Sequence, residues 1–154
     1  MKVIYTGQKI DSGKSCFLAG PTPRDKGVKS WRSDAIEIFK ELNFTGSLYI
    51  PEFPEKHYYD NETSTEEIKW DQEALEKCDI VMFWIPRDKD MLGLSTNVEF
   101  GFLINKGNIV YGRPNNAMRC EFLDYLYKSK LGKEYNTTLK QTIKEVIDIL
   151  EKEA

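Results

Sequence analysis

The sequence has little of what builds metal centres and histidine-based active sites. It contains one histidine, His57, and three cysteines, Cys16, Cys78 and Cys120, which lie far apart along the chain. A zinc cluster needs several such ligands at short spacings, and a catalytic triad needs a histidine beside its nucleophile. We therefore expect no metal and no cofactor. The cysteines are expected to be reduced and in or near the core, and His57 is expected to lie in a loop.

Long hydrophobic runs and a strong charge of one sign are also missing. No apolar run approaches the roughly 20 residues that cross a bilayer, and the first residues carry no apolar segment typical of a signal peptide. Charged residues make up 31% of the chain, yet the net charge is only -3. This balance gives no field that would attract nucleic acid or an anionic membrane. We expect a cytoplasmic protein with neither a nucleic-acid polymer nor a membrane as partner.

Short apolar segments alternate along the chain with longer segments of helical periodicity. This alternation is typical of a parallel sheet of about five strands with helices on both faces, and 154 residues fit one α/β domain, residues 1–154. The segments predicted as strands are residues 3–5, 15–19, 47–50, 80–85 and 109–111, and those predicted as helices are residues 30–42, 65–77, 98–106, 117–128 and 138–152.

Residues 80–101 give the strongest indication of a site. An apolar strand ends at Pro86, and a polar loop leads to three possible helix-capping residues, Ser95, Thr96 and Asn97. Glu99 then falls in the first turn of a helix, beside the carboxyl end of a central strand, where open α/β sheets bind ligands. First-turn carboxylates are common because the helix dipole favours them. The apolar neighbours of Glu99 favour instead a carboxylate in a cleft, suited to covalent or acid–base chemistry.

The turn after the second predicted strand is a further candidate for ligand binding. Gly20 and Pro21 begin it, and Arg24 follows two residues after Thr22. A backbone without a side chain at Gly20 can approach a ligand closely, and the Arg24 guanidinium can bind a phosphate or sugar oxygen. An ordinary strand-to-helix loop with a solvated arginine explains the same residues equally well.

Asp71 and the long segment before it are harder to interpret. Residues 51–65 are polar, aromatic and marked by proline, and a loop of that length in a compact domain is often functional. Asp71 falls in the middle of the next predicted helix, among several charged residues. On the residues alone, a solvated helix face accounts for Asp71.

The order of several motifs resembles the nucleoside 2-deoxyribosyltransferase-like family over roughly residues 15–128. The motifs are Phe-Leu-Ala-Gly-Pro-Thr-Pro-Arg at residues 17–24, Ser-Trp-Arg at 30–32, Pro-Glu at 51–52, Trp-Asp at 70–71, Asp-Ile-Val-Met-Phe-Trp-Ile-Pro-Arg at 79–87 and Ser-Thr-Asn-Val-Glu-Phe-Gly at 95–101. Their order and spacing together are more specific than any one of them.

This resemblance implies a flavodoxin-like fold and an enzyme that exchanges the base of a 2'-deoxyribonucleoside. It implies that Glu99 is the nucleophile and that Asp71 binds or protonates the base, with Asp88 as a second candidate for the proton donor. Nucleosides and free purine or pyrimidine bases are the implied small-molecule partners. It also implies a homo-oligomer. The substrate-binding residues expected from it are Gly20, Pro21, Arg24, Trp84, Arg87, Asp88, Thr96 and Asn97.

The sequence departs from the better-known transferases in one loop. Residues 87–95 form a longer connection than theirs, and Asp88 and Asp90 both stand where one acidic residue is expected. The guanidinium groups of Arg24 and Arg87 also suit an anionic substrate. Three hypotheses follow: a deoxyribosyltransferase, which we favour, a hydrolase of deoxynucleosides or their monophosphates, and a nucleotide-binding module without turnover.

Overall fold

The strands and helices follow the predicted alternation closely. The computed structural model describes residues 1–56, 58 and 62–152, so His57 lies outside the described residues. The strands are β1 (Lys2–Tyr5), β2 (Ser15–Ala19), β3 (Ser47–Ile50), β4 (Ile80–Trp84) and β5 (Ile109–Gly112), and the helices are α1 (Trp31–Glu41), α2 (Thr65–Lys77), α3 (Leu94–Leu103), a short 3-10 turn (Ile104–Lys106), α4 (Glu121–Leu131) and α5 (Leu139–Lys152). Helix α4 begins later than predicted, since residues 117–120 are not helical.

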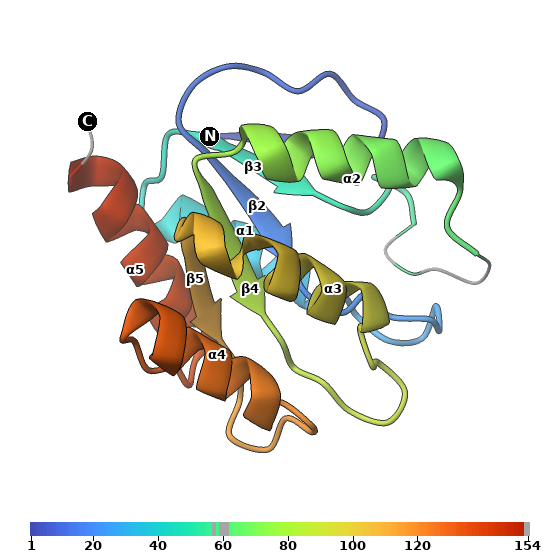
Figure 1. The fold of residues 1–154 in the computed structure, drawn as a ribbon. Helices are drawn as coiled ribbons and strands as arrows, with labels where there is room; N and C mark the ends of the chain where they lie inside the picture. Colours follow the sequence, from blue (N-terminus) through green and yellow to red (C-terminus); the bar gives the residue numbers. More distant parts are fainter. Residues whose placement is uncertain (57, 59–61, 153–154) are drawn as a thin grey trace.

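The sheet is parallel throughout and has the strand order β1-β3-β2-β4-β5 (Figure 1). From β2 the chain first winds to β3 on one side and then crosses back to β4 on the other. The predicted flavodoxin-like α/β fold is therefore confirmed, with β1 added as an edge strand. The winding reverses between β2 and β4, and ligands of open α/β sheets bind in the crevice at the carboxyl ends of the strands that flank such a point.

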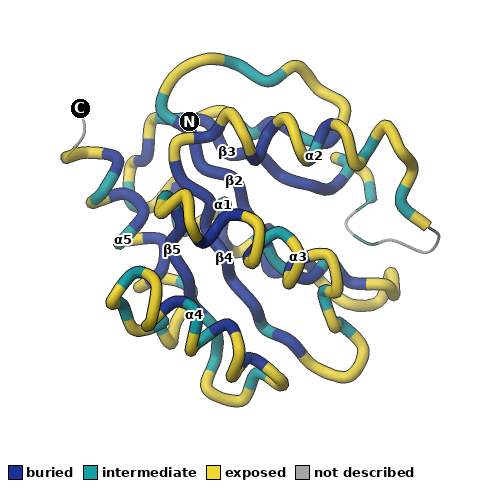
Figure 2. The backbone as a smooth tube through the Cα atoms, viewed as in Figure 1, coloured by how far each residue is buried: buried dark blue, intermediate teal, exposed yellow. Residues whose placement is uncertain are grey.

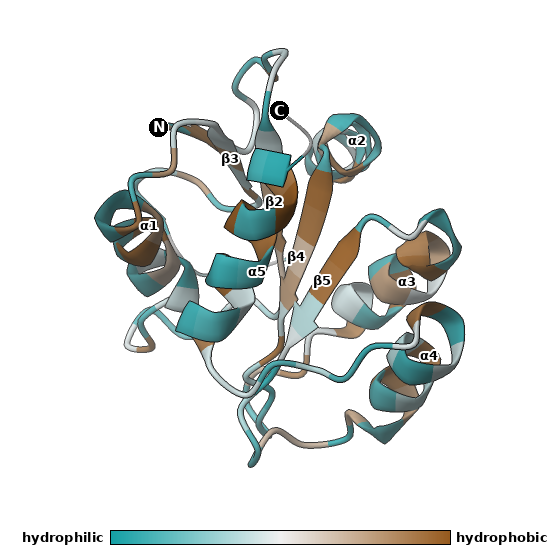
Figure 3. Cartoon of the chain, turned by 90° about the vertical axis from the view of Figure 1, so that its left-hand side faces the viewer, coloured by the Kyte–Doolittle hydropathy of each residue, from teal (hydrophilic) through white to brown (hydrophobic). Residues whose placement is uncertain are grey.

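Helices cover both faces of the sheet, because each strand turns alternate side chains to opposite sides. Phe17 and Ala19 of β2 pack with α2, α3 and α4, whereas Cys16 and Leu18 pack with α1 and α5. Viewed along the sheet, α1 and α5 lie on one side and α2, α3 and α4 on the other (Figure 3). The strands read as continuous apolar runs for this reason.

The two layers leave the middle of the sheet inaccessible to water. Strands β2, β3, β4 and β5 are buried along their whole length, whereas the outer faces of the helices are exposed (Figure 2). All three cysteines are buried and unpaired. Within the described residues, no helix combines the length and the apolar character that crossing a membrane requires.

Candidate active site

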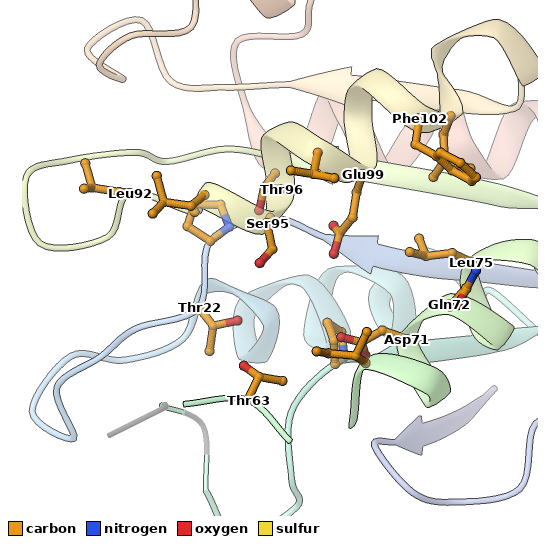
Figure 4. Close-up of a pocket in the computed structure, with 18 of the residues that line it drawn as sticks. Thr22, Thr63, Asp71, Gln72, Leu75, Leu92, Ser95, Thr96, Glu99 and Phe102 are labelled. Carbon is orange, nitrogen blue, oxygen red and sulfur yellow. The ribbon is translucent and has the colours of Figure 1, made fainter. Parts of the chain in front are cut away.

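A cavity of about 610 Å³ opens at the carboxyl edge of the sheet, between α2 and α3 (Figure 4). The turn after β2 forms its floor, and the loop before α3 forms one end. Its position matches the point where the winding of the sheet reverses. Both expected catalytic residues line it, as do four of the eight expected substrate-binding residues: Asp71, Glu99, Gly20, Pro21, Arg24 and Thr96.

Gly20 allows the ends of β2 and β4 to lie close together beneath the cavity. Its φ is +153°, and a Cβ atom there would lie 2.1 Å from the carbonyl oxygen of Trp84 and 2.8 Å from the Trp31 ring. No other residue fits that space without moving the backbone of β4. The Trp31 indole donates a hydrogen bond of 3.0 Å to the carbonyl of Pro21, which holds the next residue of the turn.

Arg32 fixes the same turn from below. Its buried guanidinium donates to the carbonyls of Leu18 (2.9 Å) and Gly20 (2.8 Å) and to the hydroxyl of Thr22 (2.9 Å). Glu52 lies 3.7 Å away and is equally buried, so the charge of Arg32 has a counter-ion. A buried cation in such a network orders every group that it touches, because breaking one bond leaves a charge unsatisfied.

Sequence reasoning missed the roles of Arg32, Glu52 and Ser30. The Ser30 hydroxyl donates to the Glu52 carboxylate and accepts from the Arg32 backbone amide, so it joins the ion pair to the start of α1. The three residues belong to the Ser-Trp-Arg and Pro-Glu motifs, which were noted only as parts of a pattern. The available signal was Glu52, a charged residue between Ile50-Pro51 and Phe53-Pro54.

Glu99 projects from the second turn of α3. We expected one of the residues 95–97 to cap this helix and Glu99 to lie in its first turn, and this was wrong. Gly93 is the N-cap, in the left-handed conformation with φ of 63°, and the helix therefore begins at Leu94. Since the first turn holds no acidic residue, the helix dipole does not account for Glu99.

Asp71 lies on the inner side of α2. Ser64 caps this helix by accepting from the amide of Glu67 at 3.2 Å, and Trp70, Ala74 and Leu75 bury its apolar face. Asp71 is partly buried, and its Oδ1 atom is buried without a hydrogen-bond partner in the described part of the chain. The alternative of a solvated helix face is therefore wrong for this residue. A buried polar atom without a partner is rare and needs an explanation such as a bound ligand.

The two carboxyl groups share one electrostatic environment. Burial raises the pKa of Asp71 to about 7, with Arg32 opposing the rise and Glu67 adding to it. Burial raises the pKa of Glu99 to about 8, and the charge of Asp71 adds to this rise while Arg32 opposes it. Interacting acids release their protons as a pair. Near neutral pH the pair therefore holds protons that ordinary carboxylates would have lost, which is typical of acid–base sites.

Four of the expected substrate-binding residues do not line this cavity. Trp84 turns to the other face of the sheet and packs among residues of α1 and α5, since neighbouring strand positions face opposite sides. Arg87 is buried and donates to the Arg119 carbonyl at 2.9 Å and to the Asn97 side chain. Asp88 accepts from the amides of residues 90 and 91. A role in substrate binding stays a prediction for these four residues.

The chemistry available in the cavity is that of two carboxyl groups beside a guanidinium. Among the described residues, no cluster of histidine, cysteine and acidic side chains has the arrangement to hold a metal ion. A carboxylate can act as a nucleophile on a carbon centre, and a second carboxyl group can exchange a proton with the leaving group. Asp90 of the expected acidic loop also lines the cavity.

Comparison with known proteins identifies the family of the chain. The family model described as nucleoside 2-deoxyribosyltransferase like matches residues 13–116, which is more than half of the 154 residues. The matched segment contains β2 to β5 and every residue of the carboxyl pair and its arginine. No curated protein matches the chain. The chain therefore belongs to the nucleoside 2-deoxyribosyltransferase-like family.

Proposed function

We propose that this protein exchanges the base of a 2'-deoxyribonucleoside through a covalent deoxyribosyl-Glu99 intermediate, with retention of configuration. The observation that carries the proposal is the pairing of Asp71 and Glu99 across one cavity at the carboxyl edge of the sheet. Family membership supports the same chemistry.

In the first step Glu99 attacks the anomeric carbon. A Glu99 oxygen forms a bond to this carbon as the carbon–nitrogen bond to the base breaks, and the bonding electrons leave with the base nitrogen. Positive charge develops on the sugar in the transition state, and this charge favours an ionised Glu99. In this proposed step the proton of the carboxyl pair is on Asp71 and Glu99 is the carboxylate. Burial raises the pKa of Glu99 to about 8, and the Arg32 guanidinium opposes that rise.

Asp71 supplies the proton that the departing base needs. Its raised pKa, about 7, keeps it protonated up to neutral pH, and protonation of the base nitrogen makes the base a better leaving group. In the second step a new base attacks the anomeric carbon, the bond to Glu99 breaks, and Asp71 receives the proton that the incoming base loses. Two displacements at one carbon give net retention.

The cavity offers a place for the base at its end distant from the start of α3. Leu75 and Gln72 of α2 and Phe102 of α3 line this end, and Figure 4 shows Phe102 across from Leu75 and Gln72. Apolar and aromatic side chains suit the faces of a purine or pyrimidine, and the amide of Gln72 can hydrogen-bond to its edge.

Two other functions use the same residues. A hydrolase differs only in that water, rather than a base, attacks the glycosyl-enzyme, and the arginine at the cavity rim, Arg24, suits a monophosphate substrate. A binding module would hold the nucleotide without turnover. The transferase and the hydrolase both require a covalent intermediate on Glu99, whereas a binding module forms none.

We also propose that residues 1–154 act as one cytoplasmic domain and assemble as a homo-oligomer. Leu94, Val98 and Phe102 form an exposed apolar stripe on α3, and Phe122 and Tyr125 are exposed on α4. Val98 and Phe102 also line the cavity, so a second copy on this stripe would cover the site. Tyr127 of α4 does not belong to this surface, because its side chain is buried beside Tyr111.

Product analysis by chromatography tests the proposed reaction. The protein is mixed with a 2'-deoxyribonucleoside, with and without a second free base, alongside Glu99→Gln and the surface control Glu73→Gln on α2. We expect a new deoxynucleoside only when the acceptor base is present, in the wild type and the control but not in Glu99→Gln. Free base released equally with or without the acceptor would identify a hydrolase. No turnover of nucleosides or monophosphates would favour the binding module.

A further inference from the structure

Arg87 is a buried cation that lacks an acidic partner. It lies in the loop after β4, and its side chain is only 4% exposed. In the described part of the chain no carboxylate forms an ion pair with Arg87, and its Nε atom is buried without a hydrogen-bond partner. By contrast, Arg32 is paired with Glu52 and Arg113 with Asp124. An unpaired buried charge is costly, and proteins keep such features mainly where function requires them.

The hydrogen bonds of Arg87 join three segments of the chain. Its Nη1 atom donates to the Arg119 carbonyl at 2.9 Å, and its Nη2 atom donates to the side-chain oxygen of Asn97. Its own carbonyl accepts from the amide of Met118 at 3.0 Å. Arg87 therefore ties the end of β4 to the start of α3 and to the segment before α4, two helices that lie next to each other on one face of the sheet (Figure 3).

Packing of their own side chains does not explain the positions of the two acceptors. Arg119 is exposed and has the left-handed conformation, with φ of 53°, which residues other than glycine rarely adopt. Asn97 is also exposed, and among the described residues its side chain makes one hydrogen bond, the one to Arg87. An unfavourable backbone conformation persists where surrounding contacts hold it, and the bond to Arg87 is such a contact for the Arg119 carbonyl.

The start of α3 is held less firmly than its end. Gly93 gives it no side-chain cap, and Thr96 is the one buried residue among residues 94–98. The end of the helix packs into the core. Asn97 precedes Glu99 by two residues, so any shift of the start of the helix moves the Glu99 carboxylate as well.

Building on the proposed function, we infer that Arg87 is a positioning residue, which holds the start of α3 so that the Glu99 carboxylate faces Asp71 and the anomeric carbon. Arg87 does not line the cavity, so it acts through α3 rather than through contact with the substrate. A misplacement of about 1 Å can cost about 100-fold in rate, so such a tie matters for catalysis. A guanidinium suits this task, because its planar fork reaches two acceptors in a fixed geometry.

Steady-state kinetics of base exchange by Arg87→Lys tests this inference. An ammonium keeps the charge but loses the fork, so we expect kcat to fall about 100-fold while KM changes less than about threefold. Arg119→Lys is the matched control, because the Arg119 side chain is exposed and its carbonyl is kept. A raised KM at unchanged kcat would overturn the inference, since it would mean that Arg87 binds the substrate.

Variants of Asn97 test whether Arg87 acts through α3. Asn97→Ala should lower kcat about as much as Arg87→Lys does. Asn97→Asp, which keeps an acceptor and adds a counter-ion, should cause a much smaller loss. The double variant Arg87→Lys/Asn97→Ala should be no slower than the slower single variant, because both changes remove the same bond. Losses that multiply in the double variant would contradict the positioning role.

Native-state hydrogen exchange, measured by mass spectrometry without substrate, separates this inference from the proposed reaction. In Arg87→Lys the backbone amides of residues 97–100 should exchange about tenfold faster, whereas those of α5 should keep their rates. Faster hydrogen exchange in α3 of a protein that exchanges no bases would support the positioning role and contradict the reaction. Base exchange by the wild type, with unchanged hydrogen exchange in the variant or an equal increase in α3 and α5, would support the reaction and contradict the positioning role.

Discussion

The carboxyl groups of Asp71 and Glu99 reach one cavity from two different helices, α2 and α3, and each stands near the buried guanidinium of Arg32. The helices belong to different crossovers of the sheet, one entering β4 and the other leaving it. Their carboxyl groups therefore meet only because β4 lies beside β2, at the point where the winding reverses. The network of Arg32, Glu52 and Ser30 beneath them holds the turn that forms the cavity floor.

Glu99→Gln should lower the rate of base exchange by at least ~10³-fold, because an amide cannot replace a carboxylate nucleophile. Rapid acid quenching followed by mass spectrometry of the intact protein checks this. The wild type should carry one deoxyribosyl adduct in a peptide that contains Glu99, and the variant should carry none. An adduct on another residue would contradict the assignment of the nucleophile.

Asp71→Asn should lower the rate by about 10²–10⁴-fold, the usual contribution of a general acid. The loss should depend on the leaving group, because a base that departs readily without protonation does not need the acid. Steady-state rates with a poor and a good leaving group, each compared with the control Glu73→Gln, measure this dependence. Equal losses for both leaving groups would mean that Asp71 positions the base rather than protonates it.

Stability should fall as pH rises, and the carboxyl pair is the reason. Both groups have a pKa in the folded protein, about 7 for Asp71 and about 8 for Glu99, above the value expected in the unfolded chain. The folded state therefore binds more protons, and its free energy of unfolding decreases from about pH 4 until both groups have ionised. Replacing each carboxyl by an amide should remove this loss, which reaches up to about 4 kcal/mol per group at pH 9.

Urea unfolding of the wild type and of Asp71→Asn/Glu99→Gln at a series of pH values checks this prediction. The difference in unfolding free energy between the two proteins should grow toward alkaline pH and vanish near pH 4. A wild-type protein that is as stable relative to the variant at pH 9 as at pH 5 would show that the pair ionises without cost.

Gly20→Ala should destabilise the protein by about 2–4 kcal/mol, since its methyl group has no space beside the Trp84 carbonyl and the backbone conformation suits only glycine. Gly101→Ala is the matched control. Gly101 lies inside α3, and a methyl group added there would meet no atom of the described residues within 4 Å, so alanine should stabilise the helix by about 0.5–1 kcal/mol. Thermal unfolding of both variants measures the contrast. A similar effect of both substitutions would contradict the close approach of β2 and β4.

Local patterns were sufficient for the order of strands and helices and for the first candidate site residue, Glu99. The run of apolar residues at 80–85, ended by Pro86, indicated a strand covered on both sides, and it implied helices on both faces of a parallel sheet. Glu99 stood out because a carboxylate among apolar neighbours is costly unless it is used. Both conclusions depend on residues adjacent in sequence, so no knowledge of the packing was needed.

Tertiary structure decided which residues meet at the site. Asp71 looked like part of a charged helix surface, and only the packing of α2 against the sheet turned it toward Glu99. Trp84 and Arg87 were expected to bind substrate, and they do not line this cavity: Trp84 faces the other side of the sheet, and Arg87 donates to Arg119 and Asn97. Gly93 caps α3 in the left-handed conformation, so the helix begins at Leu94 rather than after one of the residues 95–97. Each helix or strand is determined mainly by residues that are adjacent in sequence, so the sequence alone predicts it. The site depends on the distances between residues of different helices and strands, and these distances are set only when the sheet has assembled.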